Sequence, residues 1–159
     1  MNKPSHWCGL ILAALSLSLP AFAGTAADEV HVNNPYVRAV PAMMKNSAAF
    51  MSLHNTGGVD HAIVAASTAS AEVVELHTHT KDGNVMRMRR VDAITLKAGD
   101  TTVLQPGGLH IMLLGLTGAL SPETSIDLEL TFADGSRKAI VAPVRKVDGM
   151  HQGQGHHMH

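Results

Sequence analysis

The sequence predicts an all-β fold, a β-sandwich or a small barrel, for most of its 159 residues. Short runs of alternating apolar and polar residues recur at roughly the 8–12-residue spacing typical of such folds, and turn residues separate them. No segment shows a sustained apolar period of about 3.6 residues with helix caps. The expected strands span residues 30–40, 48–55, 62–66, 72–80, 85–91, 101–104, 109–114, 125–132 and 137–144.

Proline and glycine shape these strands locally. Pro35 cannot donate to a strand ladder, so it confines the first strand to a sheet edge or a bend. Asp-Gly pairs at 82–83 and 134–135 lie between strand-like runs, and this dipeptide favours tight β-hairpins. We therefore expect a hairpin at each of these two places.

The ends of the chain differ from this pattern. Lys3 precedes an apolar run over 8–19 that is too short to span a membrane, and a small-residue A-F-A pattern follows at 21–23. These features are typical of a leader that directs a bacterial protein to the periplasm. The predicted parts are a cleaved signal peptide over 1–23, one β-domain over 24–146 and a flexible His/Met-rich tail over 147–159.

A buried helix or a lipoprotein anchor would fit the N-terminal segment less well than a signal peptide. A buried helix would also be apolar, but it would not need the A-F-A flank. A lipoprotein anchor at Cys8 fits poorly, because Cys8 opens the apolar run whereas a lipidated cysteine would follow its end. Cleavage after Ala23 removes this single cysteine, so the mature protein would have no disulfide, no thiolate and no membrane span.

Charge and composition exclude several classes of function. The formal net charge is −1 and there is no run of Lys and Arg, so nucleic-acid binding has no electrostatic support. Aromatic residues make up only 3% of the chain, which leaves no stacking platform for bases or sugars. The unusual feature is the presence of 11 His and 9 Met, which points to metal binding.

Two histidines and two methionines flank the first Asp-Gly pair. If residues 82–83 form a two-residue loop, the ladder places His77 opposite Met88 and His79 opposite Met86. Residues two apart share a face, so all four side chains would project to one side. Opposite residues have Cβ atoms about 4.5–5.5 Å apart, which allows an imidazole and a thioether to meet at one ion.

A second His/Met pair lies further along the chain. Leu109, Ile111 and Leu113 alternate with His110 and Met112, so the three aliphatic residues can face a core while the other two face away from it together. The two pairs could form a four-coordinate site. The predicted ligands are His77, Met88, His110 and Met112, with His79 and Met86 as secondary or alternate ligands.

The residue types select the metal. Thioether sulfur is soft and neutral, and it favours Cu(I) over Zn(II), Mg(II) or Ca(II). Imidazole binds metals in its neutral form. Because neither a carboxylate nor a thiolate is among the predicted ligands, the set gives little help to doubly charged ions, and the lack of cysteine argues against a blue-copper electron carrier.

The remaining methionines and histidines need no metal to account for them. A methionine on a strand is usually core filler, which we expect of Met43, Met44 and Met51. Isolated histidines are more often exposed or hydrogen-bonded than metal-bound, which we expect of His31, His54 and His61.

The tail is a separate candidate site. It has no large aliphatic residue to bury after residue 147, and its His residues are interspersed with Met, Gln and Gly, whereas a cloning tag is usually an unbroken His run. Its candidate ligands are Met150, His151, His156, His157, Met158 and His159.

The spacing of the predicted ligands resembles a known family. Residues 77–112 follow the pattern H-x10-M-x21-H-x-M of the periplasmic PCu(A)C-type copper chaperones, and the segments V-E-L-H, M-R-M and P-G-G-L-H-I-M-L are also similar to that family. The resemblance covers roughly residues 30–144. In one departure, members often carry Met where this chain has His79.

The resemblance implies a fold, a cargo and a client. It implies a cupredoxin-like Greek-key β-sandwich that holds Cu(I) with the two His and two Met of the pattern. It also implies delivery of copper to a haem-copper oxidase subunit, towards a CuA or CuB centre, or to a partner copper chaperone. Some relatives have His/Met-rich tails thought to bind Cu(II). We expect a monomer.

Two further functions would use the same residues. A periplasmic copper buffer without a dedicated client would have the same ligands. An enzyme is the third hypothesis, with Glu75 as a general base near a hydrolytic metal, but two thioethers suit Zn(II) poorly. We therefore expect a binding protein and not an enzyme.

Overall fold

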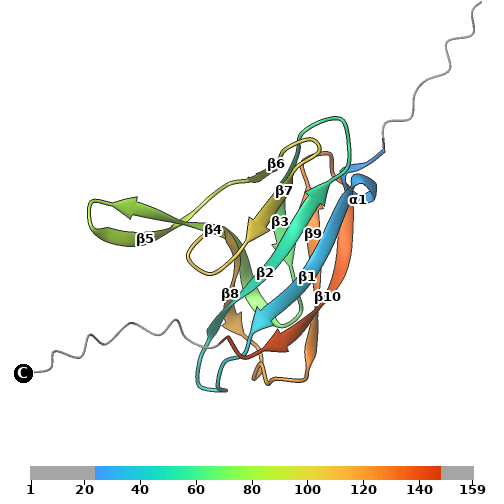
Figure 1. The fold of residues 1–159 in the computed structure, drawn as a ribbon. Helices are drawn as coiled ribbons and strands as arrows, with labels where there is room; N and C mark the ends of the chain where they lie inside the picture. The colour runs from blue at the N-terminus through green and yellow to red at the C-terminus, as the bar shows by residue number, and fades with distance from the viewer. Residues whose placement is uncertain (1–23, 148–159) are drawn as a thin grey trace, which may run out of the picture.

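The computed structural model describes residues 24–147, which form ten strands and one short helix (Figure 1). The elements are α1 (Ala26–Glu29), β1 (Val30–Arg38), β2 (Asn46–Asn55), β3 (His61–Ser67), β4 (Ala71–Asp82), β5 (Val85–Arg90), β6 (Ile94–Leu96), β7 (Thr101–Leu104), β8 (His110–Leu116), β9 (Ser125–Phe132) and β10 (Arg137–Arg145). The predicted signal peptide and the tail ligands from Met150 to His159 lie outside the described residues.

The strands form two antiparallel groups. In the first, the order is β5-β4-β8-β2-β1, and β7 also pairs with β2; in the second, it is β10-β9-β3-β6. A short parallel pairing of β1 with β10, at Val37 with Val144 and Arg38 with Arg145, joins the groups. The all-β prediction is therefore confirmed, and the β4–β5 hairpin projects from the body of the molecule in Figure 1.

The core lies between the two groups. Alternate residues of strands in both are fully buried, as the apolar alternation predicts. The largest of these side chains include Leu53, Ile63, Ile111, Leu128 and Phe132. No helix in this part of the chain is long and apolar enough to cross a membrane.

Two short elements do not appear in the sequence prediction. β6 is three residues long, with Ile94 and Leu96 buried on one side, and α1 is four residues long. Helix α1 begins at a cap in which the backbone N–H of Thr25 donates to the Asp28 carboxylate at 3.2 Å. Neither element is long enough for a periodic pattern to reveal it.

Pro35 lies at a bend, which is one of the two predicted places. β1 is an interior strand, and its pairing with β2 shifts register between Asn33 and Tyr36. The backbone of Asn34 is left-handed there, with φ of 48°. The missing N–H of proline is therefore tolerated at an irregularity and not at a sheet edge.

Both hairpins form where the Asp-Gly pairs predict them, but the register of the first prediction is wrong. Asp82 pairs with Val85, so the loop is Gly83-Asn84 and not 82–83. Gly83 has φ of 61° and takes the first loop position, where glycine is favoured in a type II′ turn. The whole ladder is displaced by two residues from the predicted one.

The displaced register changes which side chains are opposite each other. His79, and not His77, lies opposite Met88, while Met86 lies opposite Lys81. A displacement of two residues leaves every side chain on its predicted face, because the side-chain period of a strand is two. The predicted pairings are therefore wrong, but the predicted face is retained.

The expectations for the remaining methionines and histidines hold in part. Met51 is buried in the core as expected, but Met43 is 85% exposed and Met44 is 50% exposed. These two lie in the loop before β2 and not on a strand. His31 is exposed, His54 contacts the Thr101 hydroxyl at 3.0 Å, and His61 contacts the Glu29 carboxylate at 2.7 Å, so these three expectations are confirmed.

Candidate metal centre

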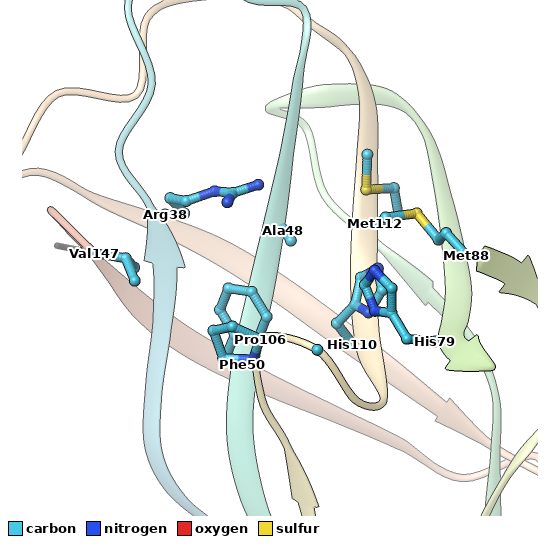
Figure 2. A pocket seen from close by; sticks show the side chains of 10 residues that line it. Arg38, Ala48, Phe50, His79, Met88, Pro106, His110, Met112 and Val147 are labelled. Carbon is cyan, nitrogen blue, oxygen red and sulfur yellow. The ribbon is translucent and has the colours of Figure 1, made fainter. Parts of the chain in front are cut away.

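A cavity of about 540 Å³ opens on the face of the first strand group that carries the His/Met pairs (Figure 2). Strands β1, β2, β4, β5 and β8 and the loop before β8 contribute to it. Its lining residues are Arg38, Ala48, Phe50, His79, Met88, Pro106, Gly107, His110, Met112 and Val147.

Strand β8 places its His/Met pair as the alternation predicts. Ile111 and Leu113 are fully buried in the core, and His110 and Met112 face the cavity. Met112 pairs with Ala48 of β2, whose small side chain leaves room above the sheet. The prediction that the two side chains face away from the core together is confirmed.

The ring of His110 is buried and has a fixed orientation. Its Nδ1 lies 3.0 Å from the carbonyl oxygen of Gly108, and because a carbonyl only accepts, Nδ1 must carry the proton. The lone pair of Nε2 is therefore free. Burial lowers the pKa of His110, so the ring stays neutral to a lower pH than free histidine does.

Strand β4 brings two histidines to the same face. His77 pairs with His110 across the β4–β8 ladder, and their ring centres are 5.7 Å apart. The ring centre of His79 is closer to His110, at 5.2 Å, and only His79 of the two lines the cavity. The Nδ1 atoms of both β4 rings are buried and have no hydrogen-bond partner among the described residues.

Glu75 has a different place from the one that a general base would need. Its Oε2 lies 2.8 Å from Nε2 of His77, and its Oε1 accepts from Arg90 at 3.4 Å. Both carboxylate oxygens are therefore engaged. This contact directs the Nε2 edge of the His77 ring towards the carboxylate.

Strand β5 contributes one of its two methionines. Met88 lines the cavity, and in Figure 2 its thioether lies on the same side as that of Met112, beside the imidazoles. Met86 is 55% exposed and is not among the lining residues. The structure thus brings together His79, Met88, His110 and Met112, with His77 adjacent.

Sequence reasoning missed two residues of the cavity. The buried Phe50 ring forms one wall, with its centre 6.3 Å from that of His110. Alternation along β2 could have placed Phe50 on the same face as Ala48. Arg38 also lines the cavity, and no sequence signal predicts it because it arrives through the distant pairing of β1 with β2.

The donor set suits a soft, singly charged ion. Within residues 24–147, no three His, Cys, Asp or Glu side chains are arranged to hold a metal by themselves. A metal centre in this cavity would depend on the thioethers of Met88 and Met112, and thioether with neutral imidazole is a combination that fits Cu(I).

Fold and cavity together define a class: an all-β domain with a mixed imidazole–thioether cavity. Residues 30–144 match the model of the LpqE-like family, whose description is that of a lipoprotein. The chain is 35% identical over 145 residues to Lxx21020 of Leifsonia xyli subsp. xyli, which is also named as a lipoprotein; the match covers 89% of this chain and 86% of that protein.

Solved structures show the same fold. The solution structure of Cu(I)-DR1885 from Deinococcus radiodurans is 30% identical with a TM-score of 0.64, and the match covers 82% of this chain and 85% of that one. The copper-bound PCuAC domain from PmoF2 is 20% identical with a TM-score of 0.65, and the match covers 77% and 97% of the two chains. The chain belongs to the LpqE-like family and is of the PCuAC type.

Proposed function

We propose that this protein is a Cu(I)-binding metallochaperone of the bacterial periplasm. The observation that carries the proposal is the convergence of two thioethers, from Met88 and Met112, with the oriented imidazole of His110 in one cavity. A fourth ligand comes from β4, where the sequence pattern predicts His77. The likeness to Cu(I)-DR1885 at 30% identity supports copper as the cargo and a cupredoxin-like Greek-key sandwich as the fold.

The neutral ligand set suits transfer. Thioethers and imidazoles bind Cu(I) without the charge of a thiolate, so the ion is held less firmly and can be released to a partner. We propose that the recipient is a haem-copper oxidase subunit, at its CuA or CuB centre, or another copper chaperone. Lipoprotein names among the relatives support a location in the cell envelope.

A binding role fits the cavity better than catalysis. Glu75, the side chain best placed to act as a base, already contacts His77 and Arg90. Hydrolytic metal sites need an open position on a hard or borderline ion with a free base nearby. The tail beyond residue 147 adds a proposed second site for Cu(II), separate from this cavity.

Replacing the thioethers tests the proposal. Met88→Ile and Met112→Ile should each lower Cu(I) affinity about tenfold or more, because the soft donors are lost while side-chain volume is nearly kept. Competition against a chromophoric Cu(I) chelator measures this effect. Met43→Ile, in the exposed loop before β2, is the matched control. Unchanged affinity in both cavity variants would refute the proposed site.

Transfer kinetics separate a chaperone from a buffer. A chaperone should pass copper to an apo CuA domain faster than copper dissociates into a chelator solution, since the ion moves within a complex of the two proteins. A transfer rate equal to the dissociation rate would instead indicate a copper buffer without a dedicated client.

A further inference from the structure

The proposed copper site needs one imidazole from β4, and two are present on that strand. We propose that His79, and not His77, supplies it. The complete ligand set is then His79, Met88, His110 and Met112. This inference rests on the proposed function, since it names a ligand of the same site.

The cavity itself favours His79. All four members of this set line it, whereas His77 does not. Figure 2 shows the His79 ring beside that of His110, with the thioethers of Met88 and Met112 next to them. An ion bound in the cavity would therefore meet His79 without any change in the strands.

The strand ladder also favours His79. It lies directly opposite Met88, a position in which Cβ atoms are about 4.5–5.5 Å apart. His77 lies opposite Arg90, whose positive charge disfavours a bound cation. In the described register, the thioether of β5 and the imidazole of β4 meet at His79.

The spacing of the rings is compatible with one shared ion. An imidazole nitrogen lies about 2 Å from a bound metal, so two rings on one ion have centres roughly 4.5–6.4 Å apart. The His79 and His110 ring centres are 5.2 Å apart. The 5.7 Å between His77 and His110 is also compatible, so the choice depends on what else holds each ring.

The two β4 rings are held differently. His77 contacts Glu75 at 2.8 Å, and Glu75 also contacts Arg90, so this ring belongs to a charged group beside the cavity. His79 has a buried Nδ1 with no hydrogen-bond partner among the described residues and no such carboxylate contact. A buried nitrogen without a partner is costly unless a ligand satisfies it. Copper would provide that partner.

Substitution by methionine gives a test that a loss of folding cannot imitate. In His79→Met, a thioether replaces the imidazole, so Cu(I) should stay bound while one nitrogen neighbour is exchanged for one sulfur. His77→Met is the matched control and should leave the neighbours unchanged. Copper X-ray absorption on the full-length protein, loaded with less than one equivalent of Cu(I) so that only the tightest site fills, counts both kinds of neighbour.

Affinity provides the second readout. His79→Asn should lower Cu(I) affinity about tenfold or more, the size seen when support of a metal ligand is removed, and His77→Asn should lower it less. A gain of one sulfur in His79→Met supports the assignment. A gain of sulfur in His77→Met, with none in His79→Met, overturns it. Failure of the proposed function looks different, because Met112→Ile would then leave Cu(I) affinity unchanged.

Discussion

His110 shows how neighbouring groups prepare one side chain for metal binding. Its ring is buried, the Gly108 carbonyl fixes the proton on Nδ1, and burial favours the neutral form. A metal-binding histidine typically donates its second ring N–H to a carbonyl or a carboxylate in this way. The sequence placed His110 on the correct face, but it could not show this hydrogen bond because the bond depends on the loop before β8.

At the same scale, the charge of Arg38 should weaken copper binding. Arg38 lines the cavity, and its positive charge contributes to the lowered pKa of His110. Arg38→Gln should therefore raise Cu(I) affinity by about two- to tenfold at low salt, and less at high salt because ions screen the repulsion.

Chelator competition at two ionic strengths measures the effect of Arg38. Arg137→Gln is the control, since Arg137 pairs with Glu129 in the other strand group. A fall in affinity for Arg38→Gln would show that Arg38 supports the cavity and does not repel its cargo.

The β4–β5 hairpin shows what can be predicted for an element. The Asp-Gly pair located the hairpin, and the period of two put His77, His79 and Met88 on one face. The exact pairing was not predictable, because Asp-Gly and Gly-Asn are both acceptable loops and differ by a shift that no side chain on the strands forbids. The cluster of His and Met survived this error only because the shift is even.

Engineered cysteines can measure this register. In the structure Thr80 lies opposite Arg87, whereas a loop at 82–83 would place Thr78 there. In a chain carrying Cys8→Ser, the pair Thr80→Cys and Arg87→Cys should form a disulfide more readily, because opposite residues have closer Cβ atoms than diagonal ones.

The matched control for the cysteine pair is Thr78→Cys with Arg87→Cys. Oxidation under a defined thiol–disulfide buffer, followed by mass spectrometry of peptides, gives the extent of each cross-link. Faster cross-linking of the control pair would restore the other register and return Met88 to a position opposite His77.

The assembly of the whole molecule is the part that the sequence predicted least. The nine expected strands all occur, but the sequence did not indicate that β1 and β10 join the two groups in parallel. That pairing has a large sequence separation, and local patterns carry no information on it. Arg38 and Phe50 reach the cavity through the long-range assembly of β1 and β2 with β8, so their roles were also hidden.

The N-terminal end of the domain is held to the β9–β10 hairpin by a carboxylate. Asp134 accepts from the Ala26 N–H at 2.7 Å and from the Ser136 hydroxyl at 2.6 Å. These hydrogen bonds, the Ala26 one first, lower the pKa of Asp134 below its ordinary value of 3.8. A lowered folded-state pKa contributes stability above pH 3.8, and this stability is lost as the pH falls through the folded value.

Asp134→Asn should therefore destabilise the protein at pH 7, and the difference from wild type should shrink below about pH 4. Urea unfolding at pH 7 and at pH 3 gives the two free energies of unfolding. Asp127→Asn, exposed on β9, is the control and should show little difference at either pH. A penalty for Asp134→Asn that is the same at both pH values would contradict the proposed ionic clamp.

The proposed function depends on two thioethers and two imidazoles that hold a single Cu(I) ion in the cavity, and copper K-edge X-ray absorption observes this arrangement directly. Measured on the purified protein loaded with less than one equivalent of copper, the spectrum should show Cu(I) with two sulfur and two nitrogen neighbours. A first coordination sphere that contains no sulfur would contradict the proposed copper site.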